Sequence, residues 1–117
     1  MANINIANEI ARALSEYRDD IVEGIDEAKL KVAKETVKDL KTTSPKLTGD
    51  YRKGWTTKKV GTAQVIHNKT EYRLTHLLEK GHAKRGGGRV EAIPHIEPAE
   101  DRAVRDYIAE VERVVRG

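Results

Sequence analysis

A chain of 117 residues, of which 38% are apolar and 35% charged, has the size of one domain and can bury only a modest core. It has no cysteine, which excludes disulfides and thiolate chemistry, and no run of about eighteen apolar residues to span a membrane. The net charge of +3 is too small by itself to indicate nucleic-acid binding. We therefore expect a single domain over residues 1–117, without a membrane partner and without a secretory signal.

Residues 5–41 have the pattern of one long amphipathic helix. Apolar residues recur every three or four positions from Ile10 to Val32, and Val37 and Leu40 continue the stripe. At about 1.5 Å per residue this helix is roughly 54 Å long, whereas a compact chain of this size has a radius of gyration of only about 13 Å. The helix must therefore bend, break near Gly24 into two helices that fold back, or project and pack against neighbouring subunits.

A hairpin is expected over residues 51–67. Pro45 ends the first helix, because the residue before a proline avoids the helical region. Gly61-Thr62 lies between two short apolar segments and indicates a hairpin turn. Trp55 is the largest apolar residue and is expected in the core, where the sheet meets a helix. With an extended segment over 90–96, the hairpin predicts an antiparallel sheet of about three strands.

Two further helices complete the predicted α+β fold. The first, over residues 71–80, follows the side-chain oxygens of Asn68 and Thr70, which favour a capped start. Gly81 comes after its last apolar residues, where a left-handed cap is needed. The second helix covers 98–115, with Pro98 in its first turn.

A basic, glycine-rich loop over residues 82–89 is expected to be flexible. It is not a phosphate-binding P-loop, because Arg89 and Val90 stand where that motif needs lysine and a hydroxyl residue. Its charge suits a DNA phosphate backbone, and it suits an acidic protein surface equally well. The candidate contact residues are Lys80, His82, Lys84, Arg85 and Arg89.

No catalytic or metal-binding pattern is recognisable in the sequence. The loop brings His76, His82 and His95 within the same region, but their spacing matches no metal motif and no cysteine assists them. The only serines, Ser15 and Ser44, lie within and at the end of the first helix. We therefore expect no enzymatic activity, no metal and no cofactor.

Two segments carry a resemblance to a known family: SPKLTGDYRKGW over 44–55, and LLEKGHAKRGGGRVEAIPHIEPAED over 77–101. They resemble the small head–tail joining, or tail-completion, proteins of the siphophage morphogenesis cluster. Tyr51 stands where that family usually has leucine, His82 where it has threonine, and His95 where it has an aromatic residue. The positions that match the family pattern are Pro45, Thr48, Gly49, Arg52, Tyr72, Leu78, Glu79, Gly81, Pro94, Ile96, Pro98 and Ala99.

The resemblance implies a structural role in virion assembly at the head–tail junction or the tail end. It implies a ring of copies, expected to be sixfold, whose partners are neighbouring head-connector and tail proteins of a phage or prophage. The expected location is the virion, after synthesis in the host bacterial cytoplasm. The residues themselves leave open a second function, a basic nucleic-acid-binding module that uses the loop from Lys80 to Arg89.

Overall fold

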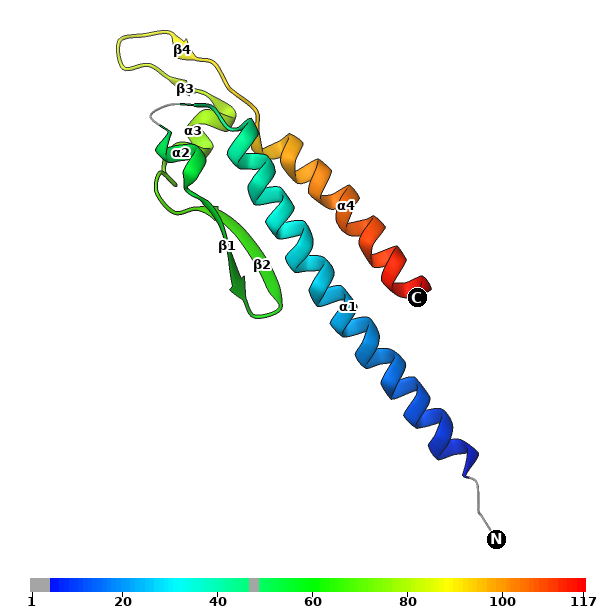
Figure 1. The fold of residues 1–117 in the computed structure, drawn as a ribbon. Coiled ribbons are helices and arrows are strands. Elements are labelled where there is room, and N and C mark those ends of the chain that lie inside the picture. Colours follow the sequence, from blue (N-terminus) through cyan, green and yellow to red (C-terminus); the bar gives the residue numbers. More distant parts are fainter. Residues whose placement is uncertain (1–4, 47–48) are drawn as a thin grey trace.

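The first helix, α1 (Ile6–Thr43), dominates the computed structural model, which describes residues 5–46 and 49–117 (Figure 1). Its start is capped by the side chain of Asn5, which accepts a hydrogen bond from the Asn8 backbone N–H at 3.1 Å. It runs without a break for 38 residues and projects beyond the other elements, so that the molecule measures 88 Å along its longest axis. The predicted long helix is confirmed, and it projects rather than folding back.

The last helix, α4 (Ile96–Arg116), lies antiparallel against the middle and C-terminal parts of α1 (Figure 1). Gly24 lets the two helices approach, because a Cβ atom at this position would lie 2.6 Å from Cγ1 of Val114. The glycine therefore marks a close helix–helix contact rather than a break. The end of α4 lies beside Tyr17, whose hydroxyl donates to the Val115 carbonyl at 3.4 Å.

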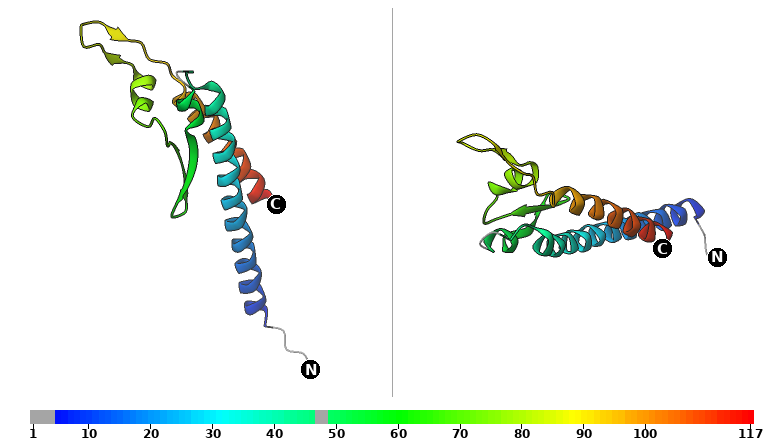
Figure 2. Two further views of the ribbon diagram at one scale, coloured as in Figure 1. Left: turned by 60° about the vertical axis from the view of Figure 1, so that its left-hand side comes forward. Right: turned by 90° about the horizontal axis from the view of Figure 1, so that it is seen from above.

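A two-stranded hairpin packs against another face of α1 (Figure 2). Its strands are β1 (Trp55–Val60) and β2 (Ala63–Asn68), and they pair antiparallel with Trp55 opposite Asn68. The turn carries Gly61 at φ 60°, as the predicted hairpin requires. The hairpin begins later than expected, because residues 50–53 form a helical turn, α2 (Asp50–Lys53), that places Tyr51 in the core.

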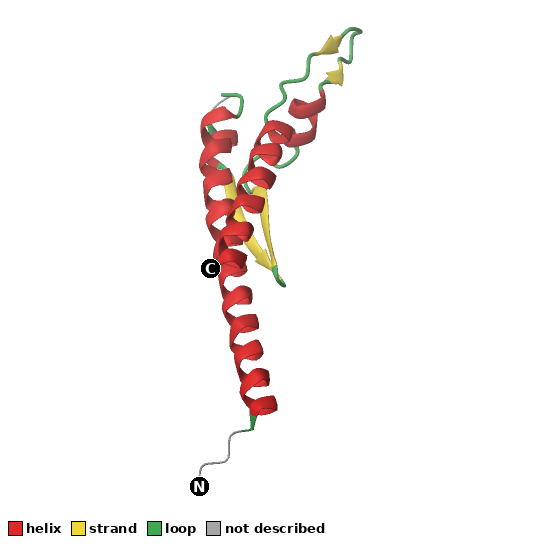
Figure 3. Ribbon diagram, turned by 90° about the vertical axis from the view of Figure 1, so that its right-hand side faces the viewer, coloured by secondary structure: helices red, strands yellow, loops and turns green. Residues whose placement is uncertain are grey.

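The expected sheet of about three strands is wrong. The segment after the basic loop contributes only β4 (Arg89–Val90), which pairs with β3 (His82–Ala83) in a separate small ribbon (Figure 3). Residues 91–95 do not continue as a strand, because Pro94 has no N–H and the neighbouring N–H groups bond elsewhere. The N–H of Ile93 donates to the Leu78 carbonyl at 2.7 Å. The basic loop is therefore the tip of a ribbon.

The short helix α3 (Leu74–Lys80) starts three residues later than expected. Asn68 does not cap it; its Oδ1 accepts instead from the N–H groups of Thr70 and Glu71, which holds a turn ahead of the helix. Gly81 has a positive φ, 73°, after the helix, but its ψ of 177° shows that it is not the expected left-handed cap. A Cβ atom on Gly81 would lie 2.5 Å from the Val90 carbonyl oxygen, so this close passage of the backbone requires glycine.

One small core lies where these elements meet, at the end of the molecule away from the N-terminus. Trp55 is buried in it, as expected from the sequence. The α+β class is confirmed, and no helix in the described ranges is both long and apolar enough to cross a bilayer. The core residues are Leu40, Tyr51, Trp55 and Ala99, with Val37, Ile66, Leu74, Leu78 and Ile96 packed around them.

Candidate functional site

The carboxylate of Glu79 ties the end of α3 to the start of α4. It accepts hydrogen bonds from the backbone N–H groups of His95 and Ile96, each at 2.8 Å, and of Glu97 at 3.0 Å. The first N–H groups of a helix have no partner within the helix, and a negative charge is stabilising there. Glu79 thus supplies from 16 residues upstream the cap that α4 lacks locally, since no side chain at its own N-cap position bonds the helix.

The same contacts keep Glu79 ionised. Burial raises the pKa of its carboxyl, but the three N–H donors and nearby His95 lower it further, so that the pKa lies below its ordinary value. A charged carboxylate is therefore the native form of Glu79 at neutral pH. The capping interaction combines charge with three hydrogen bonds, which makes it stronger than a neutral cap.

The imidazole of His95 is buried beside this cap and links it to α2. Its Nδ1 lies 2.7 Å from the carbonyl of Ile93, and because a carbonyl only accepts, Nδ1 carries a proton. In the neutral ring Nε2 then accepts from the Tyr51 hydroxyl, at 2.6 Å. Burial first, and then the charge of Glu79, raises the pKa of Tyr51 and keeps that hydroxyl protonated. The hydrogen bonds of these buried groups are therefore made to one another and to the backbone of the same chain.

The rings of this network also pack as an aromatic cluster. Tyr51 meets Trp55 and His95 edge-on, with ring centroids 5.6 Å and 5.5 Å apart. The ring of His95 therefore packs where the resembling family has an aromatic residue. The indole N–H of Trp55 donates to the fully buried hydroxyl of Ser44 at 2.8 Å, which fixes the end of α1 against the hairpin.

Asn68 closes the junction between α2 and the hairpin. Its side-chain amide donates to the Tyr51 carbonyl at 2.6 Å, while its Oδ1 holds the turn that follows β2. Gly54 makes room for it, because a Cβ there would lie 2.4 Å from that Oδ1. This explains why glycine stands at 54, ahead of Trp55.

We call the contact of α2, α3 and α4 around Tyr51, Glu79 and His95 the buried junction. Most family-like positions in the described ranges lie at or near it. Glu79 and Ala99 are buried there, Leu78 and Ile96 pack around the core, Arg52 donates to the Ser44 carbonyl, and Pro98 lies in the first turn of α4. The junction leaves out Tyr72, which is exposed with its ring beside the Arg73 guanidinium. Thr48 lies outside the described residues. The burial of Ser44, Asn68 and His95 here was not predicted from the sequence. The sequence indicated Asn68 only as a helix cap and Ser44 only as the end of the first helix, and the only signal for His95 was its place in the motif.

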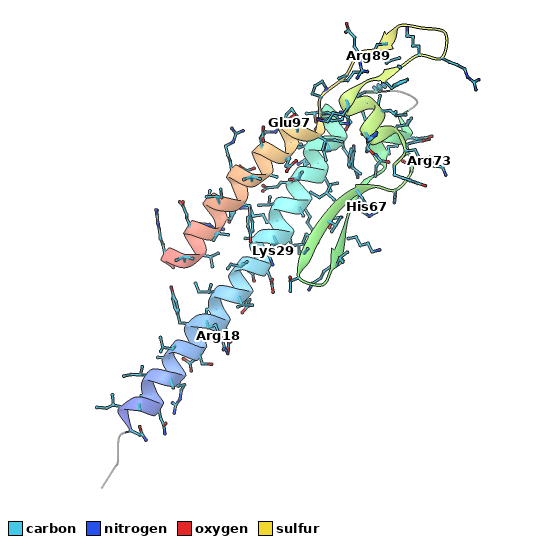
Figure 4. All side chains as sticks on the ribbon, turned by 180° about the vertical axis from the view of Figure 1, so that it is seen from behind. Arg18, Lys29, His67, Arg73, Arg89 and Glu97 are labelled. Atoms are coloured by element: carbon cyan, nitrogen blue, oxygen red, sulfur yellow. The ribbon has the colours of Figure 1, made fainter. Side chains whose placement is uncertain are left out.

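The basic candidate residues gather around the β3–β4 ribbon (Figure 4). Arg89 donates from Nη2 to the Lys80 carbonyl at 2.9 Å, so these two residues lie together at the base of the ribbon. Lys84 and Arg85 are exposed at its tip, which Gly87 and Gly88 close at positive φ. His82 differs from the others. It is half-buried in β3, and its Nδ1 is buried without a hydrogen-bond partner in the described structure.

The three histidines considered as metal ligands are not brought together. His76 is exposed on α3, and His95 uses both ring nitrogens on Ile93 and Tyr51. Within residues 5–46 and 49–117, no three histidine, aspartate or glutamate side chains form a cluster that could hold a metal ion.

These observations define a small, elongated α+β protein whose buried polar groups are used to join its elements. A family model described as "Bacteriophage HK97-gp10, putative tail-component" matches residues 8–81, more than half of the chain. The chain belongs to this family of tailed-phage components, and the resemblance to phage morphogenesis proteins is confirmed. Searches of curated proteins and of solved structures gave no match.

Proposed function

We propose that the chain is a structural protein of the virion that joins the head to the tail or completes the end of the tail, as a sixfold ring of copies. The observation that carries the proposal is the exposed N-terminal part of α1. Every residue from Asn5 to Asp20 is exposed, including the apolar Ile6, Ile10 and Leu14. Helices in proteins gain most of their stability from packing of an apolar face against other parts of the structure. A subunit of an assembly supplies that packing from its neighbours.

A structural role also fits the chemistry of the buried junction. Glu79, His95 and Tyr51 are the titratable groups that lie closest together in the core, and each is buried with its hydrogen bonds made within the chain. A catalytic group must reach a substrate, and these groups face one another. The junction instead fixes α3 and α4 relative to α1, which gives a rigid unit for assembly.

The proposed partners are further copies of the chain and the neighbouring head-connector and tail proteins. The β3–β4 ribbon extends away from the core with Lys84 and Arg85 exposed. It is suited to contact an acidic surface of an adjacent ring, or DNA that passes through the junction.

Electron microscopy of a lysate from the encoding phage, with this gene deleted, tests the proposal. Full heads beside unattached tails are expected, and supplying the intact gene in trans should restore joined particles. Normal, infectious particles from the deletion would contradict a joining or completion role.

A basic nucleic-acid-binding module is the second candidate. It is favoured by the segregation of charge: residues 41–95 contain twelve lysines and arginines but only four acidic residues. Micromolar DNA binding by the free chain, falling steeply with salt, would support it, because phosphate contacts release counterions. A variant with Lys84, Arg85 and Arg89 changed to glutamine should then bind more weakly and with a shallower salt slope.

A further inference from the structure

We infer that the N-terminal arm of α1, residues 6–23, docks into an apolar groove between α1, β2 and α4 of a second copy of the chain. The inference rests on the proposed function, because a ring needs a contact between adjacent copies, and it names the two surfaces that form that contact. The arm carries an apolar stripe, Ile6, Ile10, Leu14 and Tyr17, whose members are 54–68% exposed. Their spacing of three and four residues places them on one helix face over roughly 17 Å.

The stripe continues a line of α1 residues that is already used for packing. Further along α1, α4 packs closely against Gly24 through Val114, and its end reaches Tyr17 through Val115. The uncovered part of the stripe begins where α4 ends (Figure 2). The arm thus has an apolar face of the kind that packs against a helix within the same chain.

A groove suited to such a face lies between α1, β2 and α4. It has a volume of about 420 Å³. Its walls include Val32 of α1, Ile66 of β2, and Val104 and Tyr107 of α4. Val104 is half-exposed at the edge, and Ile108, one helical turn further, extends the apolar surface. The groove is open to solvent within one chain, and an inserted helix face would cover these side chains.

Opposite charge favours docking of the arm in this groove over contact between two arms. The arm has five acidic residues and two arginines, a net charge of −3, whereas residues 41–95 have a net charge of +8. Two arms side by side would repel each other, whereas an arm in the groove lies along β2, which belongs to this positively charged segment. Lys29 and Glu100 are the charged residues that line the groove, and Lys59 lies opposite the groove residue Gln64 in the hairpin.

The resulting contact is heterologous, with a different surface on each partner. Such contacts repeat around an axis and can close into a ring. A projecting arm at one end of the subunit and a groove beside the middle of α1 are the two surfaces that this geometry needs. The arm is also free of the buried junction, so its docking leaves the core of each subunit unchanged.

Cysteine cross-linking tests the contact directly, because the natural chain has no cysteine. One purified variant carries Ile10→Cys or Leu14→Cys on the stripe. The other carries Gln64→Cys or Val104→Cys, on opposite walls of the groove. The two are mixed at high concentration and oxidised, and the products are identified by non-reducing electrophoresis and mass spectrometry. The control is Glu16→Cys, which lies on the arm about 200° around the helix from Leu14.

At least one of the four pairs should give a mixed disulfide in about tenfold excess over the same groove variant with Glu16→Cys, because docking holds the thiols at a high effective concentration. Preferential dimers of the Leu14→Cys or Ile10→Cys variants alone would show arm-to-arm contact and overturn the inference. Mixed products no greater than the control for all four pairs would also overturn it. The test uses purified chain only, so its outcome is independent of whether the gene deletion separates heads from tails.

Discussion

Replacing Glu79 with glutamine should destabilise the fold through the start of α4. Glutamine has nearly the same shape and keeps one oxygen for the N–H groups of His95 and Ile96. Its NH₂ group replaces the oxygen that accepts from Glu97, so two donors face each other in a site where only 9% of the residue is exposed. Leaving one buried donor unsatisfied costs about 1–3 kcal/mol, and loss of the charge at the helix start adds roughly 0.3–1 kcal/mol. We expect a loss of about 1.3–4 kcal/mol, a large fraction of the stability of a small domain.

Urea unfolding followed by the fluorescence of Trp55 measures this loss. Trp55 is the only tryptophan and lies in the core beside Tyr51, so its emission reports on the junction itself. Glu91→Gln is the matched control, because Glu91 is exposed and should change the free energy of unfolding by less than about 0.5 kcal/mol. Equal midpoints for Glu79→Gln and Glu91→Gln would refute the capping role.

The pH dependence of stability tests whether the charged form of Glu79 stabilises the fold. The folded-state pKa of Glu79 lies below its ordinary value of 4.5, so its contribution is fully present above that value and is lost as the pH falls through the lowered pKa. Between neutral pH and acid, the wild-type chain should therefore lose more stability than Glu79→Gln. Parallel acid profiles for the two proteins would contradict this assignment.

Two further predictions concern the helix contact and the ribbon. Gly24→Leu should cost about 1–3 kcal/mol by overpacking against Val114, and Val114→Ala should recover much of that loss in urea unfolding of the double variant; additive losses would show that the two positions do not touch. Changing Lys84, Arg85 and Arg89 together to glutamine should leave the free energy of unfolding within about 0.5 kcal/mol of wild type. The same change should lower the yield of DNA-filled, joined particles in a complementation assay. An unchanged particle yield would exclude a role for the ribbon in assembly.

The elements that the sequence predicted well are those with a local physical cause. The 3.6-residue periodicity of α1 extends over many turns, and Pro45 limits where the helix can end. Gly61 provides the positive φ that a tight hairpin needs. The segregation of charge, with an acidic arm over residues 6–23 and a basic segment over residues 41–95, can also be read from the sequence.

The expectations that were wrong depend on distant partners. Residues 90–96 look extended, but the N–H groups of Ile93, His95 and Ile96 bond to Leu78 and Glu79 rather than to the hairpin. Sequence spacing does not reveal that choice. The four residues of α2 are too few to show a helical period. The burial of His95 was not predicted; it follows from partners on α2 and in the 91–95 segment. The resemblance pointed to Glu79, but only the geometry shows what its carboxylate does.

Cryo-electron microscopy of intact virions of the encoding phage tests the central claim most directly. The account predicts a ring of this chain at the head–tail junction or the tail end, with α1 of each copy crossing onto the adjacent copy. Virions without the chain at either place, or with copies that do not contact one another, would contradict it.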